Sequence, residues 1–186
     1  MADRLYTRIL YPPDSRQMYP LLAAALAQAP FSSPMDDASI QTHCFLPEPP
    51  AIHTVRWLHR QLTGAMIEER LLGFIDVAVG HDHATQHLAG DRPIGLLRFL
   101  ALPQDFTLSG EIARLLLKDA EEFWRGHGVR RVRAFSFSTG YPPFQLATGI
   151  LPSNWEDHHR WLNQAGYRPV ERYYCLTYPL TRLARE

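Results

Sequence analysis

Residues 95–134 constrain the fold most, because they read as a strand, a helix and a second strand joined by short turns. Residues 95–102 form a nearly unbroken apolar run, which is typical of a buried strand, and Pro103 ends it because proline cannot donate to a sheet ladder. Residues 129–137 alternate as the second strand. Between them, apolar residues recur at the spacing of one buried helical stripe: Ile112, Leu115, Leu116, Ala120, Phe123 and Trp124.

The start of this predicted helix is a candidate anion-binding site. A helix that crosses between two strands of one sheet begins beside the end of the first strand. Unpaired backbone N–H groups and the positive end of the helix dipole gather there. The turn over residues 104–113 is therefore the place where we expect a ligand, and Ser109 is placed to cap the helix.

Composition limits the classes of partner. The 186 residues suffice for one domain, and the 19 basic and 19 acidic residues cancel. This balance argues against a nucleic-acid-binding face or a polybasic membrane surface. No apolar run reaches the ~20 residues that span a bilayer, and residues 21–29 read as a helix rather than a signal peptide. Cys44 and Cys175 make no disulfide framework, so we expect a cytoplasmic protein.

Upstream of the central unit we predict a strand, two helices and a hairpin. The first helix begins where Asp14 and Gln17 have the spacing of a capping box. The expected elements are a strand over 4–11, a helix over 14–28, a proline-rich loop over 30–50, a helix over 51–60, hairpin strands over 62–67 and 70–79 around Glu68 and Glu69, and a polar loop over 81–92.

Downstream of the central unit we predict one helix and one strand. Residues 140–152 are irregular, Ser153 and Glu156 form another capping-box pattern, and the helix runs to residue 164 before Gly166. A last strand follows over residues 170–178. This mixed order indicates an α+β fold, and the absence of repeats or a linker favours a single domain over residues 1–186.

Three local patterns in this order resemble the GNAT superfamily, the GCN5-related N-acetyltransferases. GAMIEERLLGFIDVAVG resembles a hairpin of that family, and LALP with the Leu-rich helix that ends HGVRRVRA resembles its central acyl-CoA motif. WLNQAGYRPVERYYCLTYPL resembles its C-terminal helix, turn and strand. The resemblance implies one GNAT-like domain, with a mixed, mostly antiparallel sheet, helices on both faces and a splayed pair of central parallel strands.

The same resemblance implies an N-acyltransferase that moves an acetyl group from acetyl-CoA directly to an amine, in a small molecule or a peptide. The family's phosphate loop reads Arg/Gln-x-x-Gly-x-Gly/Ala, whereas this loop reads FTLSGEIAR and has one glycine. A non-catalytic acyl-CoA-binding or interaction module of the same fold is the alternative. The implied cofactor residues are the backbone groups of Leu100 and Leu102 and the turn residues Leu108, Ser109, Gly110, Glu111, Ile112 and Ala113.

The resemblance does not assign the acid and base of such a reaction. Leu162 stands where the family often has a tyrosine that acts as the general acid. Nearby alternatives are Tyr141, His158, His159, Tyr167 and Tyr173. At most one of the two consecutive histidines can face the core. We take Tyr141, Tyr173 and Asp76 as the catalytic candidates.

Asp76 lies mid-strand in LLGFIDVAVG, on the face of Phe74 and Ala78. It either borders a substrate groove or faces solvent. The histidines of HDHATQH have the spacing of a zinc site or of a polar loop, and we expect no metal, because they lack a fourth ordered ligand in sequence. Neither cysteine is placed to carry an acyl intermediate, and the sequence leaves a homodimer open. Aromatic residues that could frame a pocket or pack in the core are Phe31, Trp57, Phe137, Tyr141, Phe144 and Trp155.

Overall fold

The computed structural model describes residues 4–29, 32, 34–45, 55–82, 93–103, 107–135, 151–170 and 172. Its described strands form one sheet in the order β1-β2-β3-β4-β5, antiparallel except for the β4–β5 pair. The strands are β1 (Leu5–Ile9), β2 (Val55–Ile67), β3 (Arg70–Asp82), β4 (Ile94–Ala101) and β5 (Val132–Ala134). The predicted α+β class with a mixed, mostly antiparallel sheet is confirmed.

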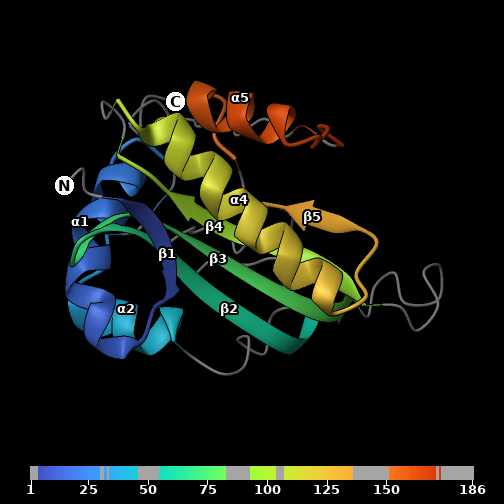
Figure 1. Ribbon diagram of the computed structural model, residues 1–186, viewed down its shortest axis with the longest axis horizontal. Coiled ribbons are helices and arrows are strands. Elements are labelled where there is room, and N and C mark those ends of the chain that lie inside the picture. Colours follow the sequence, from blue (N-terminus) through green and yellow to red (C-terminus); the bar gives the residue numbers. More distant parts are fainter. Residues whose placement is uncertain are drawn as a thin grey trace, which may run out of the picture.

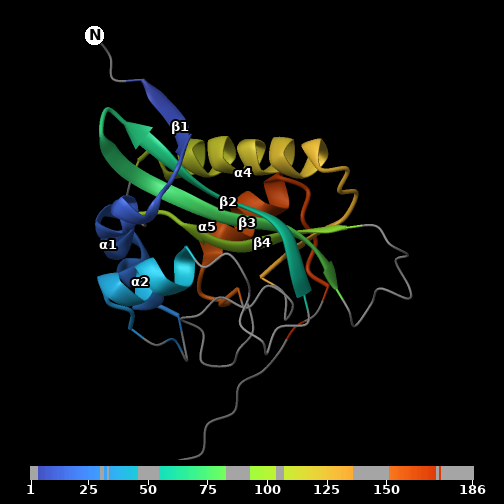
Figure 2. The same cartoon turned by 90° about the horizontal axis from the view of Figure 1, so that it is seen from below.

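Helices cover both faces of this sheet, as expected (Figures 1 and 2). Helix α4 (Ser109–Gly126) crosses one face, while α1 (Ser15–Leu26) and α2 (Asp37–Cys44) pack at the other. Helix α5 (Glu156–Gln164) lies beside α4. None of the helices in the described part of the chain is long and apolar enough to cross a bilayer.

The central unit matches its prediction closely. Every residue of β4 is buried, and the apolar stripe of α4 packs on the sheet through Ile112, Leu116, Ala120 and Trp124. The Trp124 indole N–H donates to the Ala78 carbonyl at 3.0 Å. At Gly95 an added Cβ would lie 2.9 Å from that indole ring, so the helix sits too close to the sheet for any side chain there. Gly128, with φ of +71°, terminates the helix.

Two upstream predictions were wrong. Residues 55–60 are not helical but form the first part of β2, where His59 and Arg60 pair with Val79 and Ala78. Cross-strand pairing with a buried strand outweighs the short helical pattern there. The proline-rich loop over 30–50 contains α2, whose Ile40 and Cys44 are buried in the core beside α1.

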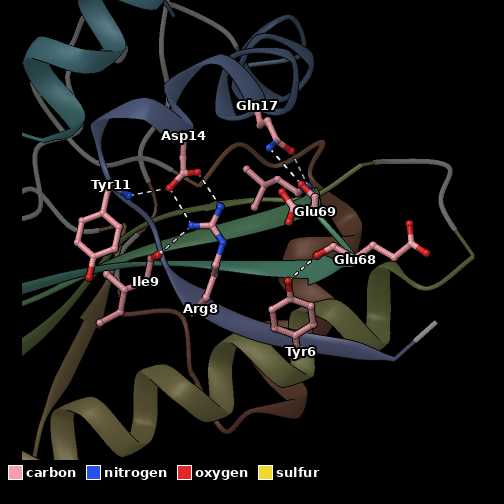
Figure 3. Close-up of polar contacts among 9 residues, drawn as sticks. Tyr6, Arg8, Ile9, Tyr11, Asp14, Gln17, Glu68 and Glu69 are labelled. Atoms are coloured by element: carbon pink, nitrogen blue, oxygen red, sulfur yellow. Dashed lines mark hydrogen bonds and ion pairs between the residues drawn. The ribbon is translucent and has the colours of Figure 1, made fainter.

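Both predicted capping boxes were wrong as well. The Asp14 carboxylate accepts from the Arg8 guanidinium at 2.7 and 2.9 Å and from the Tyr11 N–H at 2.8 Å, and it closes the short 3-10 turn η1 (Pro12–Asp14) (Figure 3). The Gln17 amide oxygen instead accepts from the Leu71 N–H at 2.8 Å, which ties α1 to the hairpin. Helix α5 begins after Trp155 without a side-chain cap.

The predicted C-terminal strands are confirmed only in part. Strand β5 begins at Val132 rather than at residue 129 and is three residues long within the described ranges. Residues 136–150, 171 and 173–186 lie outside the described residues, and with them most of the expected strand over 170–178. The helix over 153–164 is confirmed from Glu156 onward, and Gly166, with φ of +88°, follows its end.

Candidate functional site

The candidate site begins at a change of register in β4. Val77 pairs with Leu97 and the preceding Asp76 pairs with Phe99, so Arg98 is an extra residue, a β-bulge. Before the bulge, the Leu97 carbonyl accepts from the Phe135 N–H at 3.0 Å, on the side of β5. After the bulge the alternation shifts by one, and the Leu100 carbonyl points to that side. The N–H of a strand residue points the same way as its carbonyl, so Leu100 presents both groups there.

Within the described residues, no strand pairs with β4 beyond Leu97 on the side of β5, and we call this part of β4 its open edge. The described part of β5 pairs along Gly95–Leu97 of β4, and Phe135 then adopts a φ of +50°. A bulky residue takes this left-handed conformation only where its surroundings impose it, and such strain concentrates at functional sites. The expected parallel pair is thus confirmed, and it lies at the edge of the five described strands.

His158 of α5 lies at this open edge. Its Nε2 is 2.9 Å from the Leu100 carbonyl oxygen, and its side chain is 6% exposed. The Trp155 and Trp161 rings lie 4.7 and 5.5 Å from the imidazole. A carbonyl can only accept, so the hydrogen is on Nε2, and Nδ1 carries a lone pair when the ring is neutral. Burial lowers the His158 pKa, an effect that the hydrogen bond to Leu100 opposes.

Trp155 supplies a second polar group to the same corner. Its side chain is 3% exposed, and its ring meets Phe99 edge-on at 6.0 Å. Among the described residues its buried indole N–H has no hydrogen-bond partner. Leaving such a donor unpaired costs roughly 1–3 kcal/mol. An unpaired buried donor is therefore expected where a ligand oxygen binds.

The start of α4 carries no side-chain cap. Leu108 precedes the helix, and the Ser109 hydroxyl donates to the Pro103 carbonyl at 2.7 Å, so the predicted Ser109 cap is wrong. The Ile112 N–H already donates to the Leu108 carbonyl at 2.9 Å. The N–H groups of Ser109, Gly110 and Glu111 precede the first intrahelical bond and are the ones a helix start offers to an anion.

The side chains of this turn divide between the core and the outer side. Ile112 and Ala113 are fully buried, and Ile112 lies against Gly73 of β3, so neither side chain covers the helix start. Gly110 and Glu111 are exposed. An added Cβ at Gly110 would come 3.3 Å from Nε1 of Trp161, which places α5 beside the start of α4. The open edge of β4, the start of α4 and α5 therefore meet in one place.

Asp76 has a different environment. Its carboxylate is fully buried, so the solvent-facing alternative is wrong. Oδ1 accepts from Arg60 at 3.1 Å, while Oδ2 accepts from Arg60 at 2.6 Å and from Arg98 at 2.9 Å. The Arg98 guanidinium also stacks 4.0 Å above the Trp57 ring. The carboxylate thus binds the bulge residue of β4 and holds the register that orients Leu100.

The other predicted site residues lie elsewhere. Tyr141 and Tyr173 fall outside the described residues. Burial raises the pKa of Tyr167, and the negative charge of Glu121 on α4 raises it further. The Tyr167 hydroxyl therefore stays protonated. His83 and His87 are also outside, and the described residues contain no group of three or more metal-ligating side chains.

The sequence did hold a signal for the site: Trp155, His158 and Leu162 are spaced along one face of α5 and are all buried.

Comparisons with known proteins support the fold. The sequence matches no protein-family model and no curated protein. Solved structures do match: a ribosomal-protein-alanine N-acetyltransferase from Brucella melitensis biovar Abortus 2308 is 14% identical with a TM-score of 0.61, over 94% of this chain and 99% of that one.

Two aminoglycoside acetyltransferases match similarly. One, from an uncultured soil metagenomic sample in complex with sisomicin, is 15% identical with a TM-score of 0.56, over 93% of this chain and 97% of that one. The other, AAC(6')-Iy in complex with CoA, is 12% identical with a TM-score of 0.61, over 96% and 97%. The fold of this chain is that of the GNAT acetyltransferases.

Proposed function

We propose that this protein is an N-acyltransferase that moves an acetyl group from acetyl-CoA directly to an amine. One observation carries the proposal: the open edge of β4 at Leu100 lies beside the uncapped start of α4 and beside α5. An extended amide chain ending in a phosphate needs this combination of an unpaired strand edge and a helix N-terminus. The fold shared with acetyltransferases supports it.

The residues present fit the co-substrate. Backbone groups of Leu100 and Leu102 pair with its amide arm, and the Leu100 N–H polarises the acyl carbonyl. The N–H groups of Ser109, Gly110 and Glu111 bind the phosphates, while Leu108, Ile112 and Ala113 fix the helix start. The orphaned Trp155 N–H provides a donor for a ligand oxygen. When bound, acetyl-CoA supplies an activated thioester.

The acceptor is an amine of a small molecule or of a peptide. The structures of like fold include an acetyltransferase of ribosomal-protein alanine and acetyltransferases of aminoglycosides, which span both kinds. Tyr141 and Tyr173 stay predicted catalytic residues. A homodimer also stays a prediction.

Thermal unfolding with and without acetyl-CoA tests cofactor binding. A ligand at 100 times its dissociation constant adds about 2.7 kcal/mol to the native state, which is roughly 5–10 °C for a domain of this size. ATP at the same concentration is the control, since it has the phosphates without the pantetheine arm. An equal shift with ATP, or none at 1 mM acetyl-CoA, would contradict the proposal.

A binding module without catalysis is the second candidate, and Leu162 favours it. This residue is 5% exposed and stands where the resemblance implies an acidic tyrosine. Release of free thiol from acetyl-CoA separates the two functions. Thiol release that depends on an added amine supports the transferase, whereas stabilisation by acetyl-CoA without thiol release across an amine panel supports the module.

A further inference from the structure

We infer that His158 is the proton-transferring group of this site, taking a proton from the acceptor amine at Nδ1. The inference rests on the proposed function and adds a residue that the family resemblance did not assign. It follows from three observations: where the imidazole lies, which of its nitrogens is committed, and what surrounds it.

The imidazole lies where the reacting carbonyl would be bound. His158 donates from Nε2 to the Leu100 carbonyl at 2.9 Å, at the open edge of β4 beyond its described pairing with β5. The Leu100 N–H, which points to the same edge, is the donor that would polarise an acyl oxygen. One residue of β4 therefore holds the imidazole and faces the thioester, which brings the base within reach of the reacting atoms.

The hydrogen bond leaves the second nitrogen able to accept. Because Nε2 carries the hydrogen, the lone pair of the neutral ring is on Nδ1. From β4 the ring contacts the backbone carbonyl of Leu100. On its own helix, the charge of Asp157 raises the His158 pKa and that of His159 lowers it. Burial favours the uncharged ring. A buried neutral imidazole with a lone pair on Nδ1 has the form that a general base requires.

Trp155 marks the same corner as a ligand site independently of the histidine. Its indole ring lies 4.7 Å from the imidazole, and its buried N–H lacks an acceptor in the described part of the chain. A buried N–H donor of this kind fits a carbonyl oxygen of the pantetheine arm or of the acyl group.

One histidine can make both proton transfers of the reaction. The amine nitrogen forms a bond to the acyl carbon, the carbon–sulfur bond breaks with its electron pair on sulfur, and the nitrogen loses a proton. His158 takes this proton at Nδ1 and returns it to the thiolate. The products are an amide and a thiol, and the imidazole ends neutral.

A structural tether is the competing role, and His159 is the matched control for it. His159 occupies the next position of α5, and its Nε2 donates to the Pro152 carbonyl at 3.1 Å. Both histidines thus bond to a backbone carbonyl, but only His158 lies at the open edge of β4. Glutamine keeps a side-chain N–H donor, so His158→Gln and His159→Gln each preserve the possibility of a tether.

Nitrogen-15 spectra of the histidine rings test the placement without turnover. In the wild-type protein we expect the His158 ring to be the neutral Nε2–H tautomer. Saturating acetyl-CoA should shift its ring resonances, assigned by their loss in His158→Gln, more than those of His159. If acetyl-CoA raises the melting temperature and the His158 resonances do not move, the inference is overturned and the proposed function stands. If acetyl-CoA does not bind, both are overturned.

Thiol release tests the chemistry, with an aminoglycoside, a polyamine and a peptide with N-terminal alanine as acceptors. A general base contributes roughly 10²–10⁴-fold to rate, so His158→Gln should lower kcat at least ~10²-fold and remove the acid limb of the pH profile, with KM for acetyl-CoA nearly unchanged. His159→Gln should keep both within about twofold. An unchanged pH profile in His158→Gln, or no thiol release with any acceptor, overturns the inference. If His158→Gln does not fold, the ring spectra of the wild type decide, with the His158 ring assigned through its bonds to the assigned backbone.

Discussion

At the scale of single residues, Asp76 is the clearest case of a side chain whose environment the sequence could not give. Alternation along β3 correctly placed it on the face of Phe74 and Ala78, opposite the set that meets α4. Both faces of the strand proved to be buried. The arginines that surround the carboxylate come from β2 and β4, and the part of β2 that holds Arg60 carries a helical sequence pattern.

Replacing Asp76 by asparagine should destabilise the protein strongly. The change removes the negative charge between two guanidinium groups, one of them fully buried, and breaking a buried ion pair costs roughly 3–5 kcal/mol. Urea unfolding measures the loss. Asp14→Asn, which removes the charge from the more exposed pair with Arg8, is the control and should cost about 1 kcal/mol or less. Equal losses for the two variants would contradict the role assigned to Asp76.

At the scale of elements, prediction succeeded where the pattern was long and local. Helix α4 has 18 residues with a continuous apolar stripe, and β4 is a short apolar run ended by proline. The first part of β2 and helix α2 were missed because their identity depends on partners distant in sequence: β2 pairs with β3, and α2 packs on α1. The shared cause is tertiary context overriding a short local propensity.

Two glycines of α4 allow a matched test of its N-terminal role. Alanine at either Gly110 or Gly126 should favour the helix by up to ~1 kcal/mol. Only at Gly110 does the new Cβ approach another group, Nε1 of Trp161 at 3.3 Å. We therefore expect Gly110→Ala to weaken acetyl-CoA binding about tenfold, or ~1.4 kcal/mol, and Gly126→Ala to leave it unchanged, as measured by calorimetry. Weaker binding in both variants would argue against a phosphate site at the start of the helix.

At the scale of the whole molecule, the candidate site joins segments that the sequence keeps far apart. The interaction of His158 with Leu100 spans 58 residues. The order of elements predicted which segments are neighbours, including β4 and the helix that follows it. It could not predict which of two adjacent histidines is buried or that an indole N–H lacks an acceptor, because both depend on how α5 is rotated against β4.

Global stability should therefore depend on pH through His158. Burial holds its native pKa below the ordinary 6.5, so as pH falls below about 6.5 the unfolded chain takes up a proton that the native protein resists, and stability is lost. The pKa of Asp14 is lowered mainly by its hydrogen bond to Arg8, and it reduces stability only when the pH falls below the ordinary value of 3.8. The free energy of unfolding, measured from pH 7.5 to 5, should fall less in His158→Gln than in the wild type or in His159→Gln. Identical slopes in the three proteins would contradict the burial effect.

Because of the bulge at Arg98, the number of residues in β4 decides which backbone groups lie on its open edge, whatever the chemistry of their side chains. Shortening the strand by one residue would restore simple alternation and turn the backbone groups of Leu100 inward, toward β3. Such a deletion would leave the apolar composition of the strand intact and still erase the ligand-facing edge. Among related sequences, length changes should therefore accumulate in the connections on either side of β4 and be purged from the strand itself.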